Sequence, residues 1–306
     1  MRLLVVGGNG FIGRHVVGHA QALGWRVTSL SLSGSKPDSA ETKAANVDRV
    51  AVDILDRSAL ASAVRKYAYE YVINCGGYID HTSYAHGGRK VLDTHFLGVC
   101  NLVEVLNRNA LQSFVNIGSS DEYGSSPAPQ KESQREAPIS PYSLGKVAAT
   151  HFLQMLYRTE GFPGTSLRLF LTYGPGQDDK RFLPQIIKGC LEGRQFPTSR
   201  GEQLRDFCYI DDTVSAIFST LLSPSANGEV INVGSGVPIS IRQMIESVRR
   251  QVGQGEPRFG EIAYRPGENM ELYADISKAR TVLDWEPKTS LEMGLAMTIQ
   301  WIRDRM

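Results

Sequence analysis

The chain has 306 residues, enough to bury a large core, and its length predicts one large domain plus a smaller part. The formal net charge is +1, so composition gives no indication of a nucleic-acid or membrane partner. The four cysteines are scattered, without a CxxC pair or metal-ligand spacing, which predicts no metal site and a reduced, cytoplasmic protein. Met1 leads directly into an apolar strand pattern, so we expect no signal peptide, and no apolar segment is long enough to cross a bilayer.

A glycine-rich turn follows the first apolar strand pattern. Residues 3–6 are apolar, Gly7, Gly10 and Gly13 come next, and helical spacing then continues to Gly24. Strand, glycine turn and helix in this order predict a dinucleotide site, although a tight turn without a ligand is the competing interpretation. Glycine lets the backbone approach a pyrophosphate and lets helix and strand pack closely, while the helix N-terminus favours negative charge. The predicted cofactor contacts in this turn are Gly7, Gly10, Phe11, Ile12 and Gly13.

The second predicted strand, residues 26–31, ends without an acid. Enzymes that prefer NAD commonly carry a carboxylate there, which binds the ribose hydroxyls. This segment instead offers hydroxyls and a positive charge from Ser31, Ser33 and Lys36. Because no carboxylate repels a ribose phosphate, we favour NADP(H) as the cofactor, with NAD(H) as the alternative.

Two further strand patterns complete the predicted cofactor site. Residues 49–52 lead to Asp53 and Ile54, which we expect beside the adenine. Residues 71–75 open into Gly76 at the presumed ligand edge.

The loop after residue 77 carries Asp80 and His81. His81 is expected to reach the nicotinamide or the substrate, and an ordinary surface turn is an equal alternative. Helices are predicted on either side of these strands, over residues 56–67 and about 89–107.

The stretch from Gly118 to Lys146 carries the predicted chemistry. An apolar strand pattern over residues 113–117 ends at Gly118, so Ser119 lies at a strand's carboxyl end, where open α/β sheets bind ligands. A helix is predicted from Pro141 onward, and Tyr142 and Lys146 are four residues apart, so they share a face of it.

Strands alternate with helices up to residue 169, which predicts an α/β fold with a Rossmann-like, doubly wound parallel sheet. We place the dinucleotide-binding domain at residues 1–172 and a smaller substrate-binding domain at residues 173–306, with residues 208–235 as a segment that returns to the first domain. In the second part we expect mostly loop over residues 253–267 and an N-capped helix after residue 210. The other predicted elements are helices at 182–191, 277–283 and 291–303 and strands at 205–209 and 230–233.

Taken together, these motifs make the chain resemble an extended short-chain dehydrogenase/reductase of the nucleotide-sugar epimerase/dehydratase/reductase type. The resemblance runs nearly end to end. It rests on Gly7xxGly10xxGly13, Ser119, Tyr142xxxLys146, Arg168 through Pro175, Arg205-Asp206-Phe207, Tyr209 to Asp212, Arg265 to Glu268 and Ala274 to Ala279.

The resemblance implies a role for each of these residues. Tyr142 would be the acid/base group, with Lys146 favouring its phenolate and bonding the nicotinamide ribose. Ser119 would hold the sugar oxygen, and Arg205 and Arg265 would bind a nucleotide diphosphate through charge-assisted hydrogen bonds. The family also implies a homodimer and a nucleotide-diphosphate sugar as substrate. Leu171 and His95 occupy positions where relatives often have asparagine, which predicts a differently built sugar pocket.

Three reactions share this machinery: 4-epimerisation, 4,6-dehydration and reduction of a 4-keto sugar. Counting back from Tyr123-Gly124 aligns Ser119 with the catalytic hydroxyl of dehydratases, Ser120 with their aspartate and Asp121 with their glutamate. Ser120 is therefore a candidate substrate contact and Asp121 a candidate catalytic acid that is one methylene short. The segment is similar to that of nucleotide 4-keto-6-deoxy-sugar reductases, so NAD(P)H-dependent C4 reduction is the first choice. A 4-epimerase or 4,6-dehydratase is the alternative, and a non-catalytic NADP sensor is a further one.

Overall fold

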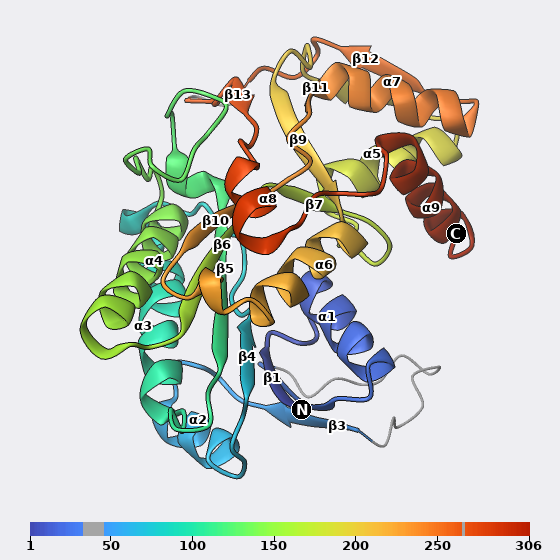
Figure 1. Cartoon of the computed structure of the whole chain (residues 1–306). Helices are drawn as coiled ribbons and strands as arrows, with labels where there is room; N and C mark the ends of the chain where they lie inside the picture. Colours follow the sequence, from blue (N-terminus) through green and yellow to red (C-terminus); the bar gives the residue numbers. More distant parts are fainter. Residues whose placement is uncertain (33–45, 265–266) are drawn as a thin grey trace.

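The computed structural model describes residues 1–32, 46–264 and 267–306. A seven-stranded parallel sheet forms its centre, in the order β10-β6-β5-β4-β1-β2-β3 (Figure 1). Its strands are β1 (Arg2–Val6), β2 (Arg26–Ser31), β3 (Val47–Ala51), β4 (Tyr71–Asn74), β5 (Ser113–Ser119), β6 (Gly164–Leu169) and β10 (Val230–Val233). The order reverses direction beside β1, so the carboxyl ends of β1 and β4 open into a crevice typical of a ligand site.

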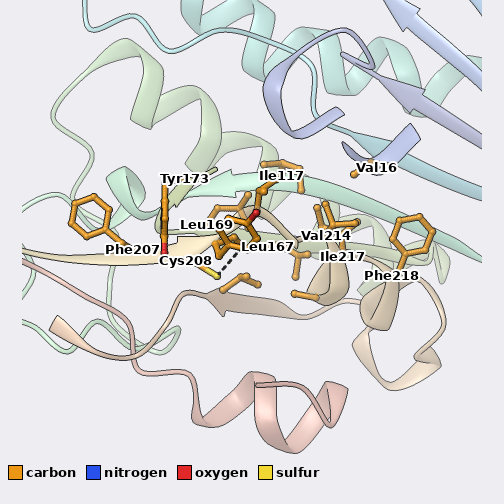
Figure 2. Close-up of a cluster of buried hydrophobic side chains, with 14 of the residues drawn as sticks. Val16, Ile117, Leu167, Leu169, Tyr173, Phe207, Cys208, Val214, Ile217 and Phe218 are labelled. Atoms are coloured by element: carbon orange, nitrogen blue, oxygen red, sulfur yellow. Dashed lines mark hydrogen bonds between the residues drawn. The ribbon is translucent and has the colours of Figure 1, made fainter. Parts of the chain in front are cut away.

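Helices cover both faces of this sheet (Figure 1). One face packs against α2 (Arg57–Val64), α3 (Arg89–Val105) and α4 (Pro141–Glu160), and the other against α1 (Phe11–Ala22) and α6 (Ile210–Leu221). The strands are buried on both sides because each face carries its own hydrophobic core, as expected for a parallel sheet. Figure 2 shows part of the α6 side, where Ile117, Leu167 and Leu169 of the sheet lie near Val214 and Ile217 of the helix.

The remaining residues build a smaller mixed part above the carboxyl edge of the sheet. One sheet contains β9 (Leu204–Tyr209), β11 (Pro238–Ser240), β13 (Glu271–Leu272) and β7 (Leu171–Tyr173), and a two-stranded sheet pairs β8 (Gln195–Thr198) with β12 (Glu256–Phe259). The helices of this part are α5 (Phe182–Leu191), α7 (Ile241–Val252) and α9 (Leu291–Arg303), whereas α8 (Ser277–Leu283) packs against α6 and β10 at the large sheet. Within the described ranges, short 3-10 helices lie at η1 (Tyr84–His86), η2 (Ser120–Tyr123) and η3 (Pro224–Ala226).

The parallel doubly wound sheet is confirmed, and so is the smaller second part. The stretch predicted as mostly loop is mostly loop where it is described, but it contains the short strand β12, whose partner is the distant β8. One local prediction was wrong. Helix α6 has no side-chain cap, because Tyr209 occupies the cap position, and Asp212 in the first turn accepts from the backbone N–H groups of Lys288 and Thr289.

The boundary between the two parts is crossed by the chain more than once. After the second part begins, α6 returns to cover the large sheet and β10 pairs with β6 at its edge. The division at residue 172 stays a prediction. Across the helices that the structure describes, none is both long and apolar enough to span a membrane.

Candidate active site

The glycine turn between β1 and α1 has the geometry that a dinucleotide phosphate requires. Gly7 has a φ of +76°, and a Cβ there would lie 2.6 Å from the carbonyl oxygen of Cys75. A Cβ at Gly13 would lie 2.1 Å from the carbonyl oxygen of Gly7, so only glycine allows α1 to pack this closely on the strand. Helix α1 begins at Phe11 after Gly10, whose position has no side-chain cap. The N-terminus of α1 therefore faces the turn and suits an anionic group.

The carboxyl end of β2 lies beside the same turn. The Oγ of Ser31 accepts a hydrogen bond from the backbone N–H of Asn9 at 3.1 Å, so a neutral hydroxyl stands at this strand end. Nη1 of Arg49, on the neighbouring β3, donates to Oδ1 of Asn9 at 3.3 Å and brings a cation to the same place. Ser33 and Lys36 lie outside the described residues. This end of the site can receive a ribose that carries either hydroxyls or a phosphate.

The predicted adenine contacts lie after β3. Oδ1 of Asp53 accepts from the N–H of Leu55 at 2.9 Å, which fixes the turn, and the Asp53 side chain is exposed. Ile54 is buried and would meet a Cβ placed on Gly76, so it packs under the end of β4. The N–H of Gly76 donates to Oδ1 of Asn74 at 3.0 Å. These contacts hold the backbone of the crevice, and the direct cofactor roles of Asp53, Ile54 and Gly76 stay predictions.

Ser119 ends β5 and caps the short helix η2. Its Oγ accepts from the N–H of Asp121 at 3.1 Å, and its own N–H donates to Oε1 of Glu122 at 2.9 Å. This reciprocal capping box fixes both the backbone and the hydroxyl of Ser119. Ser120 is buried, at 4% exposure, as Tyr142 and Lys146 are, and its role as a substrate contact stays a prediction.

Tyr142 and Lys146 come from the first turns of α4, as the spacing predicted. Ser140 caps this helix and Pro141 occupies its first position, two features that favour a helix start just before Tyr142. Both side chains are buried, and Nζ of Lys146 lies 5.9 Å from the centre of the Tyr142 ring. That Nζ donates to the carbonyl oxygen of Ile117 on β5 at 2.6 Å. Strand β5 and helix α4 thus bring Ser119, Tyr142 and Lys146 together.

The electrostatics of this group differ from the expectation that Lys146 favours the Tyr142 phenolate. Burial raises the pKa of Tyr142, Asp121 raises it further, and a hydrogen bond with Ser119 lowers it. Burial also lowers the pKa of Lys146 to about 8, which Glu122 and Cys75 oppose. The physical reason is desolvation, because burial disfavours the charged form of each group. Tyr142 therefore holds its proton in this structure.

Asp121 faces the same crevice from η2. Its Oδ2 lies 3.8 Å from Nε2 of His81, and the His81 ring lies edge-on to Tyr142 with 5.6 Å between ring centres. Burial raises the pKa of the Asp121 carboxyl, while His81 and Arg205 oppose the rise. The loop that carries His81 thus reaches the Tyr142 side chain, and a contact of His81 with the nicotinamide or the substrate stays a prediction.

Arg205 on β9 approaches from the smaller part. Nη2 of Arg205 pairs with Oε1 of Glu268 at 2.5 Å, and its side chain is 12% exposed. Burial lowers the pKa of Arg205, while Glu268 and Asp121 raise it. The guanidinium therefore stands across the crevice from the Ser119 group, at the place where an anionic part of a substrate would complete the charge balance. Arg265 lies outside the described residues.

Two further groups lie at the site: His95, which the sequence marked as a departure from its relatives, and Glu122, which had no predicted role. His95 of α3 lies under Gly77, its ring edge-on to Tyr142 with 4.8 Å between centres, and its Nε2 contacts the carbonyl oxygen of Tyr78 at 2.9 Å. Burial lowers the pKa of His95 to about 3, so its ring is neutral. Glu122, directly after the doubtful acid Asp121, is fully buried and bonded to Ser119. Its burial beside Arg168 had no sequence signal, because the two residues are 46 positions apart.

The arrangement can move a hydride and a proton at one carbon atom. Tyr142 supplies a proton-carrying Oη, Ser119 supplies a hydroxyl next to it, and the glycine turn with the β1 and β4 ends supplies a dinucleotide cradle. Within the described ranges, no group of His, Cys, Asp and Glu side chains could hold a metal ion.

Known proteins with this architecture carry nicotinamide cofactors and nucleotide sugars. Over 97% of its length the chain is 30% identical to a dTDP-glucose 4,6-dehydratase of Xanthomonas campestris pv. campestris (strain B100), and the match covers 92% of that protein. Its structure resembles a Thermotoga maritima UDP-glucose 4-epimerase solved with UDP-glucose (TM-score 0.88, 27% identity, 100% and 99% of the two chains). It equally resembles a Bacillus cereus UDP-glucuronic acid 4-epimerase in complex with UDP-glucuronic acid and NAD (TM-score 0.88, 27% identity, 100% of both chains).

These relatives support the epimerase or dehydratase alternative better than the ketoreductase first choice. The family model described as the NAD dependent epimerase/dehydratase family matches residues 3–234, which include the glycine turn, Ser119, Tyr142 and Lys146. The chain therefore belongs to this family of nicotinamide-dependent enzymes, in which nucleotide-sugar epimerases and dehydratases are grouped.

Proposed function

We propose that this protein catalyses hydride transfer at C4 of a nucleotide-diphosphate hexose, with 4-epimerisation as the first candidate reaction. The observation that carries the proposal is the grouping of Ser119, Tyr142 and Lys146 at the carboxyl edge of the sheet, across from Arg205. Relatives solved with UDP-glucose and UDP-glucuronic acid support this substrate class.

The described residues fit a nicotinamide dinucleotide. The turn from Gly7 to Gly13 would hold its pyrophosphate, and Lys146 would hold the nicotinamide ribose. When bound, the nicotinamide supplies the hydride acceptor or donor.

The protein's own groups perform the proton transfer. Ser119 and Tyr142 would both bond the C4 oxygen. Tyr142 would first give up its own proton, and its phenolate Oη would then take the proton of the C4 hydroxyl as the C4 hydrogen leaves as hydride. The raised pKa of Tyr142 opposes formation of this phenolate in the free protein, so a nearby positive charge on Lys146 and on an oxidised nicotinamide would promote it. Epimerisation then requires the keto sugar to turn and receive the hydride on its other face, with Tyr142 returning the proton.

Dehydration is less well supported by the site. It requires an additional acid and base at C5 and C6. One of these positions is Ser120, which has no carboxyl group, and Glu122 is committed to Arg168 and Ser119. Within residues 120–122, that leaves Asp121, whose carboxyl lies near His81. A single carboxyl group does not supply both the acid and the base that dehydration requires.

Reduction of a 4-keto-6-deoxy sugar is the second candidate, and one observation favours it. A consumed cofactor is commonly NADPH, and the β2 end offers the Ser31 hydroxyl and the Arg49 guanidinium near Asn9. A hydroxyl and a guanidinium at this strand end suit a ribose phosphate. NADP(H) therefore accompanies the reductase proposal, and NAD(H) the epimerase proposal.

A substrate panel separates the two. The protein is incubated with NAD⁺ and UDP-glucose, UDP-glucuronic acid or dTDP-glucose, and separately with NADPH and nucleotide-linked 4-keto-6-deoxy sugars. Epimerisation gives the 4-epimer by NMR without net change in nicotinamide absorbance, whereas reduction consumes one NADPH for each product. If the protein binds the cofactor but forms no 4-epimer and consumes no NADPH with any of these sugars, both candidate reactions are excluded.

A further inference from the structure

A buried carboxylate stands directly behind the predicted catalytic group. The Glu122 side chain has no exposed surface, and both of its oxygens are used. Oε1 accepts from the backbone N–H of Ser119 at 2.9 Å. Oε2 accepts from Oγ1 of Thr150 at 3.0 Å and from Nε of Arg168 at 3.0 Å. One side chain therefore joins the end of β5, helix α4 and strand β6.

Arg168 is the counter-charge of this carboxylate, and it is fully buried too. Its Nη2 donates to Oε1 of Glu136 at 2.5 Å, and its guanidinium lies 4.6 Å from the centre of the Tyr123 ring. Among the described residues, its Nη1 has no hydrogen-bond partner. Buried ion pairs of this kind are costly to desolvate, and apolar residues of similar volume often stabilise a fold at least as well. Stability alone is thus a weak reason for placing these charges under Ser119.

We propose that Glu122 is a positioning residue for hydride transfer: it fixes Ser119 through the backbone amide and places a negative charge behind Lys146. The expected effect of Glu122 on turnover rests on the proposed C4 chemistry, whereas its expected effect on the pKa of Lys146 does not. Glu122 has no exposed surface for a substrate or cofactor to contact, so it would act through Ser119 and Lys146.

The charge of Glu122 acts against the burial of Lys146. Groups from three elements face this lysine: Glu122 from η2, Cys75 after β4 and His95 from α3. Burial lowers the pKa of Lys146 to about 8, while Glu122 and Cys75 raise it. The thiol of Cys75 is itself neutral near pH 8, because burial raises its pKa to about 12. Glu122 is therefore the anion that keeps Lys146 charged near neutral pH.

The first test measures Lys146 directly and needs no substrate. Lysine labelled with ¹³C at Cε is titrated by NMR in wild type and in Glu122→Gln, with the Lys146 signal assigned from Lys146→Met. Glutamine keeps an oxygen for the Ser119 N–H and removes the charge, so we expect the pKa of Lys146 to fall by about one unit. Glu136→Gln is the matched control, because it also removes a carboxylate partner of Arg168 but does not contact Ser119. An unchanged Lys146 titration in Glu122→Gln, or an equal fall in Glu136→Gln, overturns the proposal.

The second test is kinetic. Glu122→Gln is expected to lower kcat about tenfold near pH 7.5 while KM changes less than about twofold, because the sugar still binds. Glu136→Gln should keep kcat. A loss of kcat that matches the loss of folded protein in both variants would indicate a structural role only. If wild type turns over none of the nucleotide sugars, the proposed function fails while the Lys146 titration still decides the role of Glu122.

Glu122→Gln removes one of the carboxylates that pair with the buried Arg168, so this variant is the one at risk of misfolding. Glu122→Gln/Arg168→Gln removes both charges and leaves no lone buried cation. The double variant is expected to show the same fall in the pKa of Lys146, and a wild-type value in the folded double variant contradicts the proposal.

Discussion

Tyr142 is the residue on which the proposed chemistry depends most directly. Its Oη is the acid/base atom of the proposed C4 chemistry and hydrogen-bonds with Ser119, so Tyr142→Phe should lower turnover by at least about 10²-fold. The phenyl ring keeps the edge-on contact with His95, so folding and cofactor binding should persist. Turnover is measured on the responsive sugar, and cofactor affinity by NADH fluorescence. Wild-type rates in this variant would mean that the active site lies elsewhere.

Lys146 should make stability depend on pH in a defined window. Its folded-state pKa of about 8 lies below the ordinary value of 10.5, so the unfolded chain binds more protons between these two values. The cost of burying Lys146 is complete below about pH 8 and is relieved as the pH rises towards 10.5. Wild type should therefore gain stability across this window, whereas Lys146→Met should not. The difference between the variant's and the wild type's free energy of unfolding, measured by urea titration, should decrease as the pH rises. Lys180→Met, at an exposed position, should show no such trend.

At the scale of elements, the sequence predicted the bounds of a helix or strand best where signals within that segment determine its structure. Helices α5, α8 and α9 and strands β2 and β10 have the predicted bounds, because apolar spacing and flanking glycine or proline mark them locally. The pairing of β12 with β8 was missed, since it depends on residues about 60 positions apart. The same holds in the site: Ser119, Tyr142 and Lys146 lie in local motifs, whereas the Glu122–Arg168 pair forms only in three dimensions.

Helix α4 offers a test of how an element's start supports the site. The Oγ of Ser140 accepts from the N–H of Ser143, the residue after Tyr142, so Ser140→Ala should lower stability by about 1 kcal/mol and also lower kcat. Ser290 caps α9 in the same way, at a helix of the smaller part that carries none of the predicted catalytic residues. Ser290→Ala should thus cost similar stability in urea unfolding and leave kcat unchanged. Equal kcat losses in both variants would show that the cap of α4 does not position Tyr142.

At the scale of the whole molecule, the chain crosses between its two parts at β10, and Asp206 holds that crossing together. Its buried carboxylate, on β9 of the smaller part, accepts from the N–H groups of Ser235 and Gly236 just after β10 and from the N–H of Ala274. Burial raises the pKa of Asp206, and these hydrogen bonds oppose the rise.

Asp206→Asn should therefore weaken the junction between the two parts. The amide turns an N–H₂ group towards backbone donors, so the free energy of unfolding should fall by roughly 1–3 kcal/mol. Because Arg205 precedes this residue on β9, the nucleotide-sugar Kd should rise while the cofactor Kd stays constant, since the cofactor cradle belongs to the large sheet. Calorimetric unfolding and separate titrations with the two ligands measure these effects. A parallel weakening of cofactor binding would mean that the two parts are coupled through more than this carboxylate.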